Sequence, residues 1–238
     1  MGITRLIAER VTDYDDPDSP ASRMRLKRFA PFLDLIDETI GTHGYATVLD
    51  IGGTRKYWNI LPSRYLIGGK LRITILNLSG VNKNQDDEVF SYRHGDACDL
   101  GQFDAGTFHI IHSNSCIEDV GGWLRICQFA EEVRRLTSSG GYFIQTPNYW
   151  FPVEPHNLTP LFHWLPRPVR VSLVQRFRLG HWPKSSNVID AVRWVESARL
   201  LDRKEFAALF PDATFVTERL FGMPKSFIAI HTPSRESK

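Results

Sequence analysis

Residues 45–54 read YATVLDIGGT, and this stretch points to the fold class. An apolar, β-branched run that stops at two glycines predicts a buried strand followed by a tight turn. Similar runs predict further strands over residues 71–78 (LRITILNL), near Tyr92, over residues 107–113 (TFHIIHS) and over residues 141–148 (GYFIQTPN). The chain therefore contains a series of five predicted strands.

Helix-length spacers separate these strands. Apolar residues at three- and four-residue steps predict a helix over residues 22–40, ended by Gly41 and Gly44, and another over residues 123–133, closed by SSGG. Strands that alternate with helices pair in parallel, and helices cover both faces of their sheet. The sequence predicts an α/β fold with a doubly wound, mostly parallel sheet.

Two stretches depart from this alternation. Residues 214–221 and 225–231, separated by GMP, predict a terminal antiparallel hairpin, and Asp202 followed by Glu205 predicts a capped helix start before it. Residues 150–201 are too long for a simple crossover, so we expect a helical insertion after the fifth strand. We expect residues 1–21 to form an N-terminal segment and linker, and residues 22–238 to form one domain.

Composition excludes several classes of protein. Hydrophobic residues make up 42% of the 238 residues and charged residues 24%, which is typical of a soluble globular chain. No apolar run approaches the ~18 residues of a spanning helix, and the N-terminus lacks the apolar core of a signal peptide, so we expect a cytoplasmic protein. The three cysteines show no zinc-ligand spacing, and neither disulfides nor structural zinc are expected.

Positive charge is concentrated in the predicted insertion. Residues 161–204 contain nine Lys or Arg and three Asp or Glu, which gives this stretch +6, whereas the whole chain carries +2. A sugar nucleotide, a lipid-linked phosphate, an anionic membrane surface or RNA would each fit such a field. A solvated helix face is the alternative explanation.

The turn after the first predicted strand is a candidate ligand site. Glycines at a strand end let the backbone approach a bound group without a Cβ clash, although a simple tight turn has the same sequence. Arg55 and Lys56 stand where a GxGxxG fingerprint would place further glycines. The pattern therefore disfavours a nicotinamide-dependent dehydrogenase.

Polar residues follow the next three strands as well. Asn77 ends the second strand, Asp96 follows the third, and Ser113 and Asn114 end the fourth. Ligands of doubly wound sheets bind at the carboxyl ends of the strands. Together these side chains offer donors and acceptors suited to a ribose and an adenine.

At this point the chain resembles the class I S-adenosylmethionine-dependent methyltransferases, in their type 11-like branch. The matching segments are VLDIGG (48–53), GDACDL (95–100), FDAGTFHIIHSNSCIEDV (103–120) and EEVRRLTSSGGYFIQTPN (131–148). The resemblance covers about residues 47–148 and reaches the terminal hairpin, because that family ends its sheet with a reversed strand. It implies a seven-stranded Rossmann-like fold and S-adenosylmethionine as the cofactor.

The resemblance also implies roles for single residues. It places Asp50 near the methionine end of the cofactor, Asn77 at the ribose hydroxyls and Asp96 at the adenine amino group. Thr54 and Asn77 replace a glycine and an acid of the family pattern, and this keeps a non-catalytic cofactor-binding or scaffold module open as the alternative function. The full expected cofactor set is Asp50, Gly52, Gly53, Thr54, Asn77, Leu78, Asp96, Ala97, Ser113 and Asn114.

The loop after the fifth strand, TPNYWFPVEPHN, is the expected acceptor side. Methyl transfer from a sulfonium is a direct displacement, in which the protein aligns the acceptor and removes a proton. The candidate bases are Glu154, His156 and His163, although a packed histidine is the common alternative. Aromatic and basic side chains expected to bind the acceptor are Tyr149, Trp150, Arg167 and Arg170.

The sequence thus predicts methylation of a heteroatom, oxygen first, on a small-molecule or glycan acceptor that carries negative charge. RNA is disfavoured because TPNYW is not the Asn/Asp-Pro-Pro-aromatic motif of base-amino methyltransferases. Divalent-ligand spacing is missing after the strand ends, so we expect no metal requirement.

Overall fold

The computed structural model describes residues 20–78, 85–137 and 140–232. Its sheet has seven strands in the order β3-β2-β1-β4-β5-β7-β6. Neighbouring strands from β3 to β5 are parallel, and β7 is antiparallel to both β5 and β6. The strands are β1 (Ala46–Ile51), β2 (Leu71–Asn77), β3 (Phe90–His94), β4 (Ile110–Asn114), β5 (Gly141–Pro147), β6 (Thr214–Leu220) and β7 (Met223–His231). The predicted fold class is confirmed, including the terminal hairpin.

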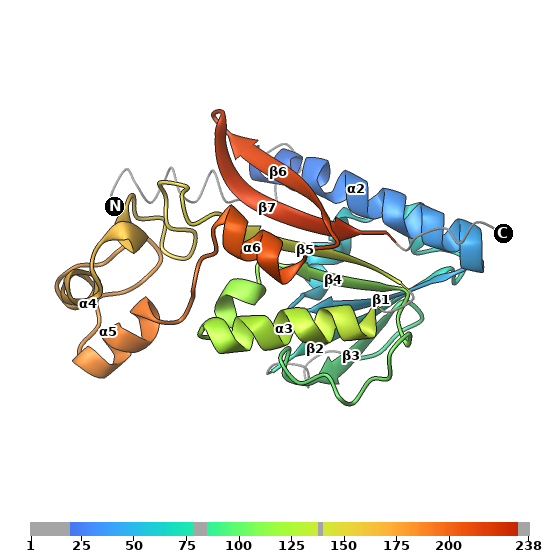
Figure 1. Ribbon diagram of the computed structural model, residues 1–238, viewed down its shortest axis with the longest axis horizontal. Helices are drawn as coiled ribbons and strands as arrows, with labels where there is room; N and C mark the ends of the chain where they lie inside the picture. The colour runs from blue at the N-terminus through green and yellow to red at the C-terminus, as the bar shows by residue number, and fades with distance from the viewer. Residues whose placement is uncertain (1–19, 79–84, 138–139, 233–238) are drawn as a thin grey trace.

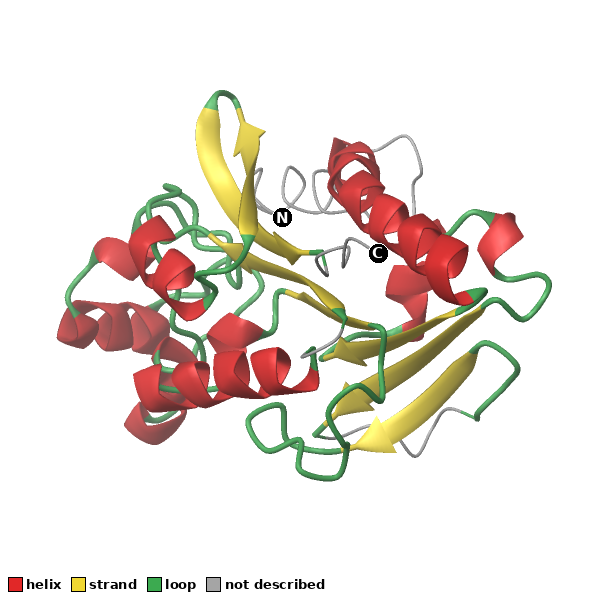
Figure 2. Ribbon diagram, turned by 45° about the vertical axis from the view of Figure 1, so that its right-hand side comes forward, coloured by secondary structure: helices red, strands yellow, loops and turns green. Residues whose placement is uncertain are grey.

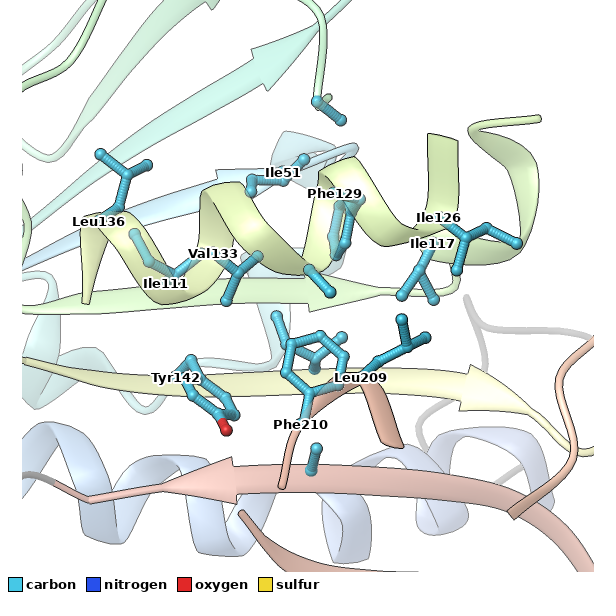
Figure 3. Packing of buried hydrophobic residues seen from close by; sticks show 14 of the residues in the cluster. Ile51, Ile111, Ile117, Ile126, Phe129, Val133, Leu136, Tyr142, Leu209 and Phe210 are labelled. Atoms are coloured by element: carbon cyan, nitrogen blue, oxygen red, sulfur yellow. The ribbon is translucent and has the colours of Figure 1, made fainter. Parts of the chain in front are cut away.

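Helices cover both faces of the sheet (Figures 1 and 2). Helix α2 (Pro20–His43) packs on one face through a cluster that includes Phe29, Phe32 and Ile36. Helices α3 (Trp123–Leu136) and α6 (Arg203–Leu209) cover the other face, where Phe129, Val133 and Phe206 contribute to the second cluster. Figure 3 shows residues of this second cluster between α3 and the sheet, together with Leu209 and Phe210.

Several boundaries differ from the sequence prediction. Helix α2 continues through Gly41 and ends before Gly44, which takes a left-handed φ of 81° and donates its N–H to the Ile40 carbonyl. The fourth strand begins at Ile110 because Thr107 belongs to a turn closed on the Asp104 carbonyl. The expected N-terminal segment and linker lie outside the described residues up to position 19.

The crossover between β1 and β2 contains no long helix. It consists of two short 3-10 helices, η1 (Arg55–Ile60) and η2 (Ser63–Tyr65). Thr54 caps η1 with its side-chain oxygen, which accepts the Tyr57 N–H. The residue that departs from the family's glycine pattern therefore starts this short helix.

The stretch between β5 and α6 forms a helical lobe at one end of the sheet (Figure 1). It contains η5 (Phe162–Trp164), α4 (Arg167–Arg176) and α5 (Val188–Val195). Its buried residues form a cluster of their own around Phe162, Val174 and Ala191. Asp202 caps α6 in a reciprocal capping box with Glu205, as the sequence predicts.

None of the helices in the described ranges combines the length and the apolar character that a membrane span requires.

Candidate functional site

The carboxyl ends of β1 to β4 lie along one edge of the sheet, because these neighbouring strands are parallel. At this edge the Asp50 carboxylate is fully buried. Its Oδ2 accepts the Trp58 Nε1–H at 2.7 Å, and its Oδ1 lies 2.7 Å from Nδ1 of His112. The rings of Phe32 and Phe143 pack against His112, with centroids 4.7 and 5.5 Å from its own. Asp50 thus ties Trp58 and His112 to the end of β1.

The two glycines after β1 leave no room for side chains. A Cβ on Gly52, whose φ is 77°, would lie 2.5 Å from the Cys116 sulfur, and a Cβ on Gly53 would lie 1.6 Å from Asp50 Oδ2. The Asn77 amide donates to the Gly53 carbonyl at 2.8 Å. A carboxylate could not make this bond, which explains why an amide occupies the position in this chain. The turn is therefore held from two sides.

A cavity of about 250 Å³ lies beside this glycine turn. It is lined by Arg25, Asp50, Gly52, Gly53, Thr54, Lys56, Tyr57, His112 and Asn114. Two buried polar atoms at the cavity, the Tyr57 hydroxyl and His112 Nε2, have no hydrogen-bond partner in the described part of the chain. Buried polar groups without partners are costly, so both atoms favour a polar ligand here. This polar cavity fits the amino-acid end of the implied cofactor.

The Asp96 carboxylate follows β3 and is paired with Arg125. Both carboxylate oxygens accept from the Arg125 guanidinium, at 2.6 and 2.7 Å, and Oδ1 also accepts the Cys98 N–H. The Arg125 hydrogen bonds, followed by the Cys98 N–H, lower the pKa of Asp96. One third of its side chain is exposed, so an ionised acceptor is available at the adenine position.

Three other expected cofactor residues lie in different surroundings. Ser113 is fully buried, and its hydroxyl donates to the Ile51 carbonyl at 3.1 Å, so it joins β4 to β1. Leu78 is 63% exposed at the end of β2, whereas Ala97 is buried. Asn114 remains at the cavity beside the glycine turn.

A partly buried polar cluster around Asn114 was not predicted from the sequence. Arg28 on α2 donates to the Asn114 side chain at 2.7 Å and to both oxygens of Glu218 on β6 at 3.1–3.3 Å. Gln145 of β5 also accepts from Arg28, at 3.4 Å. The partners lie up to 190 residues apart, and the one local sign of the cluster is a glutamine inside an otherwise apolar strand.

The acceptor-side residues gather at a second cavity, of about 670 Å³, between the end of β5 and the helical lobe. It is lined by residues that include Tyr149, Trp150, Glu154, His156, His163, Arg167 and Arg170. All seven residues expected on the acceptor side are thus brought together. The two cavities share no lining residue.

Glu154 and His156 are committed to each other. The Glu154 carboxylate accepts the backbone N–H groups of His156 and Asn157 and bonds Nδ1 of His156 at 2.7 Å. Nε2 of His156 lies 3.2 Å from Asp119. Burial opposes the charge on His156, but bonds to Asp119 and Glu154 outweigh it and raise the pKa of the ring to about 10. A doubly bonded imidazolium has no lone pair to accept a proton.

His163 has the opposite character. Its Nε2–H donates to the Tyr149 carbonyl at 2.8 Å, and the same carbonyl accepts from Trp164 Nε1. Burial lowers the pKa of His163, which keeps the ring neutral near pH 7. Nδ1 then carries a lone pair; the atom is buried and has no hydrogen-bond partner among the described residues. Of the three candidate bases, His163 has an uncommitted acceptor atom.

Glu118 is a further unusual acid near this cavity. It is fully buried, Thr146 donates to its Oε2 at 3.1 Å, and its Oε1 has no partner among the described residues. Burial, followed by the neighbouring charge of Asp119, raises the pKa of Glu118 to about 8. The carboxyl group is therefore mostly protonated at neutral pH.

Comparisons with known proteins agree with this geometry. The family model described as "Methyltransferase domain" matches residues 53–145. Similar solved structures include the CurJ carbon methyltransferase, with 13% identity over 94% of this chain and 61% of that chain and a TM-score of 0.55. The methyltransferase domain of bacterial CtHen1 has 11% identity over 88% of this chain and 99% of that chain, with a TM-score of 0.50.

Another similar structure, titled as putative zinc-dependent alcohol dehydrogenases from Rhodobacter sphaeroides, has 11% identity over 89% of this chain and 99% of that chain, with a TM-score of 0.52. Identities this low show a shared fold and nothing finer. No curated protein matches the chain.

Proposed function

We propose that this chain is a class I S-adenosylmethionine-dependent methyltransferase that methylates a heteroatom, oxygen first, of a small-molecule or glycan acceptor; the methyltransferase family model that matches residues 53–145 and the methyltransferase fold support this. One observation carries the cofactor part of this proposal. A glycine turn with no room for a Cβ borders a cavity in which Tyr57 and His112 keep unpartnered buried polar atoms. When bound, the cofactor supplies an electrophilic methyl group on a sulfonium.

The residues along the strand ends divide the cofactor between them. The Gly52–Gly53 backbone, Tyr57, His112 and Asn114 would hold the amino-acid end, since all of them line the smaller cavity. Asn77 keeps its side-chain oxygen for a ribose hydroxyl, because its amide N–H₂ bonds Gly53. Asp96, ionised and partly exposed, would accept from the adenine amino group.

On the acceptor side, the larger cavity supplies the groups that a hydroxyl acceptor needs. Its aromatic and basic walls would align the acceptor, and His163 would accept its proton at Nδ1. Glu154 and His156 would position the loop between β5 and η5 through their mutual bond and the contact with Asp119. In this assignment His163 acts as the base, whereas Glu154 and His156 position the loop.

A non-catalytic cofactor-binding module is the second candidate. The observation that favours it is that both nitrogens of His156 are bound to carboxylates, which removes one candidate base. Release of S-adenosylhomocysteine in the presence of an acceptor library separates the two functions. Turnover supports the enzyme, whereas cofactor binding without turnover over a broad panel of acceptors supports the module.

Calorimetric titration with S-adenosylmethionine tests the cofactor site. Asp96→Ala is expected to weaken binding by about 1–3 kcal/mol, the cost of losing a hydrogen bond to a charged group. The matched control is Asp99→Ala, an exposed carboxylate in the same loop whose only side-chain bond to a described residue is a long one, 3.5 Å, from the Gly101 N–H. Thermal unfolding of both variants checks that the fold is retained. Unchanged affinity in Asp96→Ala would remove the adenine assignment.

A further inference from the structure

We propose that the larger cavity is a receptor for a carboxylate carried on a ring, and that Arg170 binds this carboxylate. The inference rests on the proposed function, because it treats the cavity as the acceptor site and names the chemical class of acceptor. It starts from the charges that line the cavity.

The cationic side chains at the cavity differ in whether a carboxylate pairs with them. Arg167 is paired with Glu196, Arg199 donates to Glu205 at 3.0 Å, and His156 lies between two carboxylates. Arg170 has no side-chain hydrogen bond or ion pair to any residue in the described ranges, and its Nε is fully buried. Among the arginines that line the cavity, Arg170 is the one with which no described carboxylate forms a direct ion pair.

The carboxylates at the cavity are all committed elsewhere. Glu154 bonds His156 and two backbone N–H groups, and Asp202 caps α6 by accepting the N–H groups of Lys204 and Glu205. Glu196 and Glu205 hold the two other arginines. A carboxylate that pairs with Arg170 must therefore come from a ligand, because no lining acid is left to do so.

The surroundings favour a singly charged ligand over a dianion. Arg170 is half-buried, and burial lowers the pKa of its guanidinium, so the positive charge already carries a desolvation cost. A planar guanidinium matches one carboxylate through two parallel bonds. The charges of Glu154 and Glu196 also act at Arg170 and would repel a second negative charge. A monocarboxylate suits this field better than a phosphate dianion.

The rest of the cavity favours a ring. Trp182 packs against Phe162 edge-on, with centroids 5.9 Å apart, and against Trp194 at 6.0 Å. Trp150, 63% exposed, lines the same cavity. Aromatic faces bind flat or puckered rings through area burial and stacking. The volume, about 670 Å³, lies in the range of small-molecule pockets, about 300–1,000 Å³.

Titrations of intrinsic tryptophan fluorescence test the proposal without a known acceptor, since three tryptophans line the cavity. The probes are glucuronate, its methyl ester, benzoate and inorganic phosphate. We expect saturable quenching by glucuronate or benzoate, and the tighter of the two identifies a sugar acid or an aromatic acid. The ester is expected to bind at least tenfold more weakly than glucuronate, because a bond to a charged group is lost. Equal affinity for ester and acid, or tighter binding of phosphate, overturns the proposal.

Variants locate the site. Arg170→Met is expected to weaken carboxylate binding about tenfold to a hundredfold and to leave ester binding unchanged. Arg176→Met, exposed at the end of the same helix α4, is the matched control and should stay within twofold. An equal loss in Arg176→Met overturns the assignment. If Arg170→Met does not fold, as circular dichroism would show, the wild-type comparison of acid and ester decides alone.

Calorimetry with S-adenosylmethionine on the same samples separates this proposal from the proposed function. Intact cofactor binding without carboxylate binding overturns the carboxylate receptor only. Carboxylate binding without cofactor binding overturns the proposed methyltransferase function and supports the Arg170 carboxylate site by itself. Release of S-adenosylhomocysteine with the bound carboxylate as acceptor supports both.

Discussion

The buried carboxylate under the glycine turn allows a quantitative test of the site's architecture. Asp50 accepts from Trp58 Nε1 and bonds Nδ1 of His112, each at 2.7 Å, and none of its side chain is exposed. Asp50→Asn keeps the shape and volume of the side chain. It replaces one acceptor oxygen by an N–H₂ donor, so one of the two ring N–H groups meets another donor in either orientation of the amide.

The magnitude follows from these two bonds. A buried donor left without its partner costs about 1–3 kcal/mol, and the remaining bond loses its charge assistance, about 1 kcal/mol more. The sum is about 2–4 kcal/mol, out of a typical total stability of about 5–15 kcal/mol. His112 can reverse its ring tautomer and accept from the new amide, which sets the lower end of this range. For a domain of this size the melting temperature should fall by about 4–16 °C.

Urea unfolding at neutral pH, followed by circular dichroism, measures this change. The matched control is Asp104→Asn, since Asp104 is exposed and its backbone carbonyl, not its carboxylate, accepts from Thr107. We expect the control to stay within about 0.5 kcal/mol of the wild type. Binding of S-adenosylmethionine should weaken in Asp50→Asn, because this carboxylate packs directly against Gly53. If Asp50→Asn is as stable as the control, the two bonds do not support the turn and the reasoning is wrong.

Two further predictions concern the effects of a chelator and of pH. A chelator should leave turnover unchanged, since removal of a proton by a general base needs no metal; lost activity that magnesium restores would contradict this. Burial raises the pKa of Glu118 from its ordinary value of 4.5 to about 8, so the folded state keeps a proton that the unfolded chain releases, and wild-type stability should fall as pH rises through this window. Glu118→Gln retains an oxygen for Thr146 and has no proton to lose, so its stability relative to the wild type should increase between about pH 5 and pH 9 in urea unfolding. A difference that does not change with pH would contradict this.

Much of the fold is readable from local pattern. The run before Gly52, the GMP turn before β7 and the Asp202 and Glu205 pair each specify a structure within a few residues, because strand period, turn chemistry and helix capping are short-range properties. The first crossover was less predictable. Its length suits a helix, but the segment folds into two 3-10 turns that place Tyr57 and Trp58 in the core under α2.

Which side chains at the two cavities remain available to a ligand depends on pairings between residues that lie far apart in the sequence. Arg167 and Arg170 carry the same side chain, yet Glu196, just after α5, forms an ion pair with the first, whereas no described residue forms one with the second. The sequence makes His156 a candidate base, but the fold places Asp119 beside its Nε2, so this nitrogen is not available as a base. The availability of a charge or a lone pair depends on which distant groups come within hydrogen-bond distance, and sequence separation does not reveal this. The positions of the strand ends therefore followed from sequence, while the chemistry available at them was determined by tertiary packing.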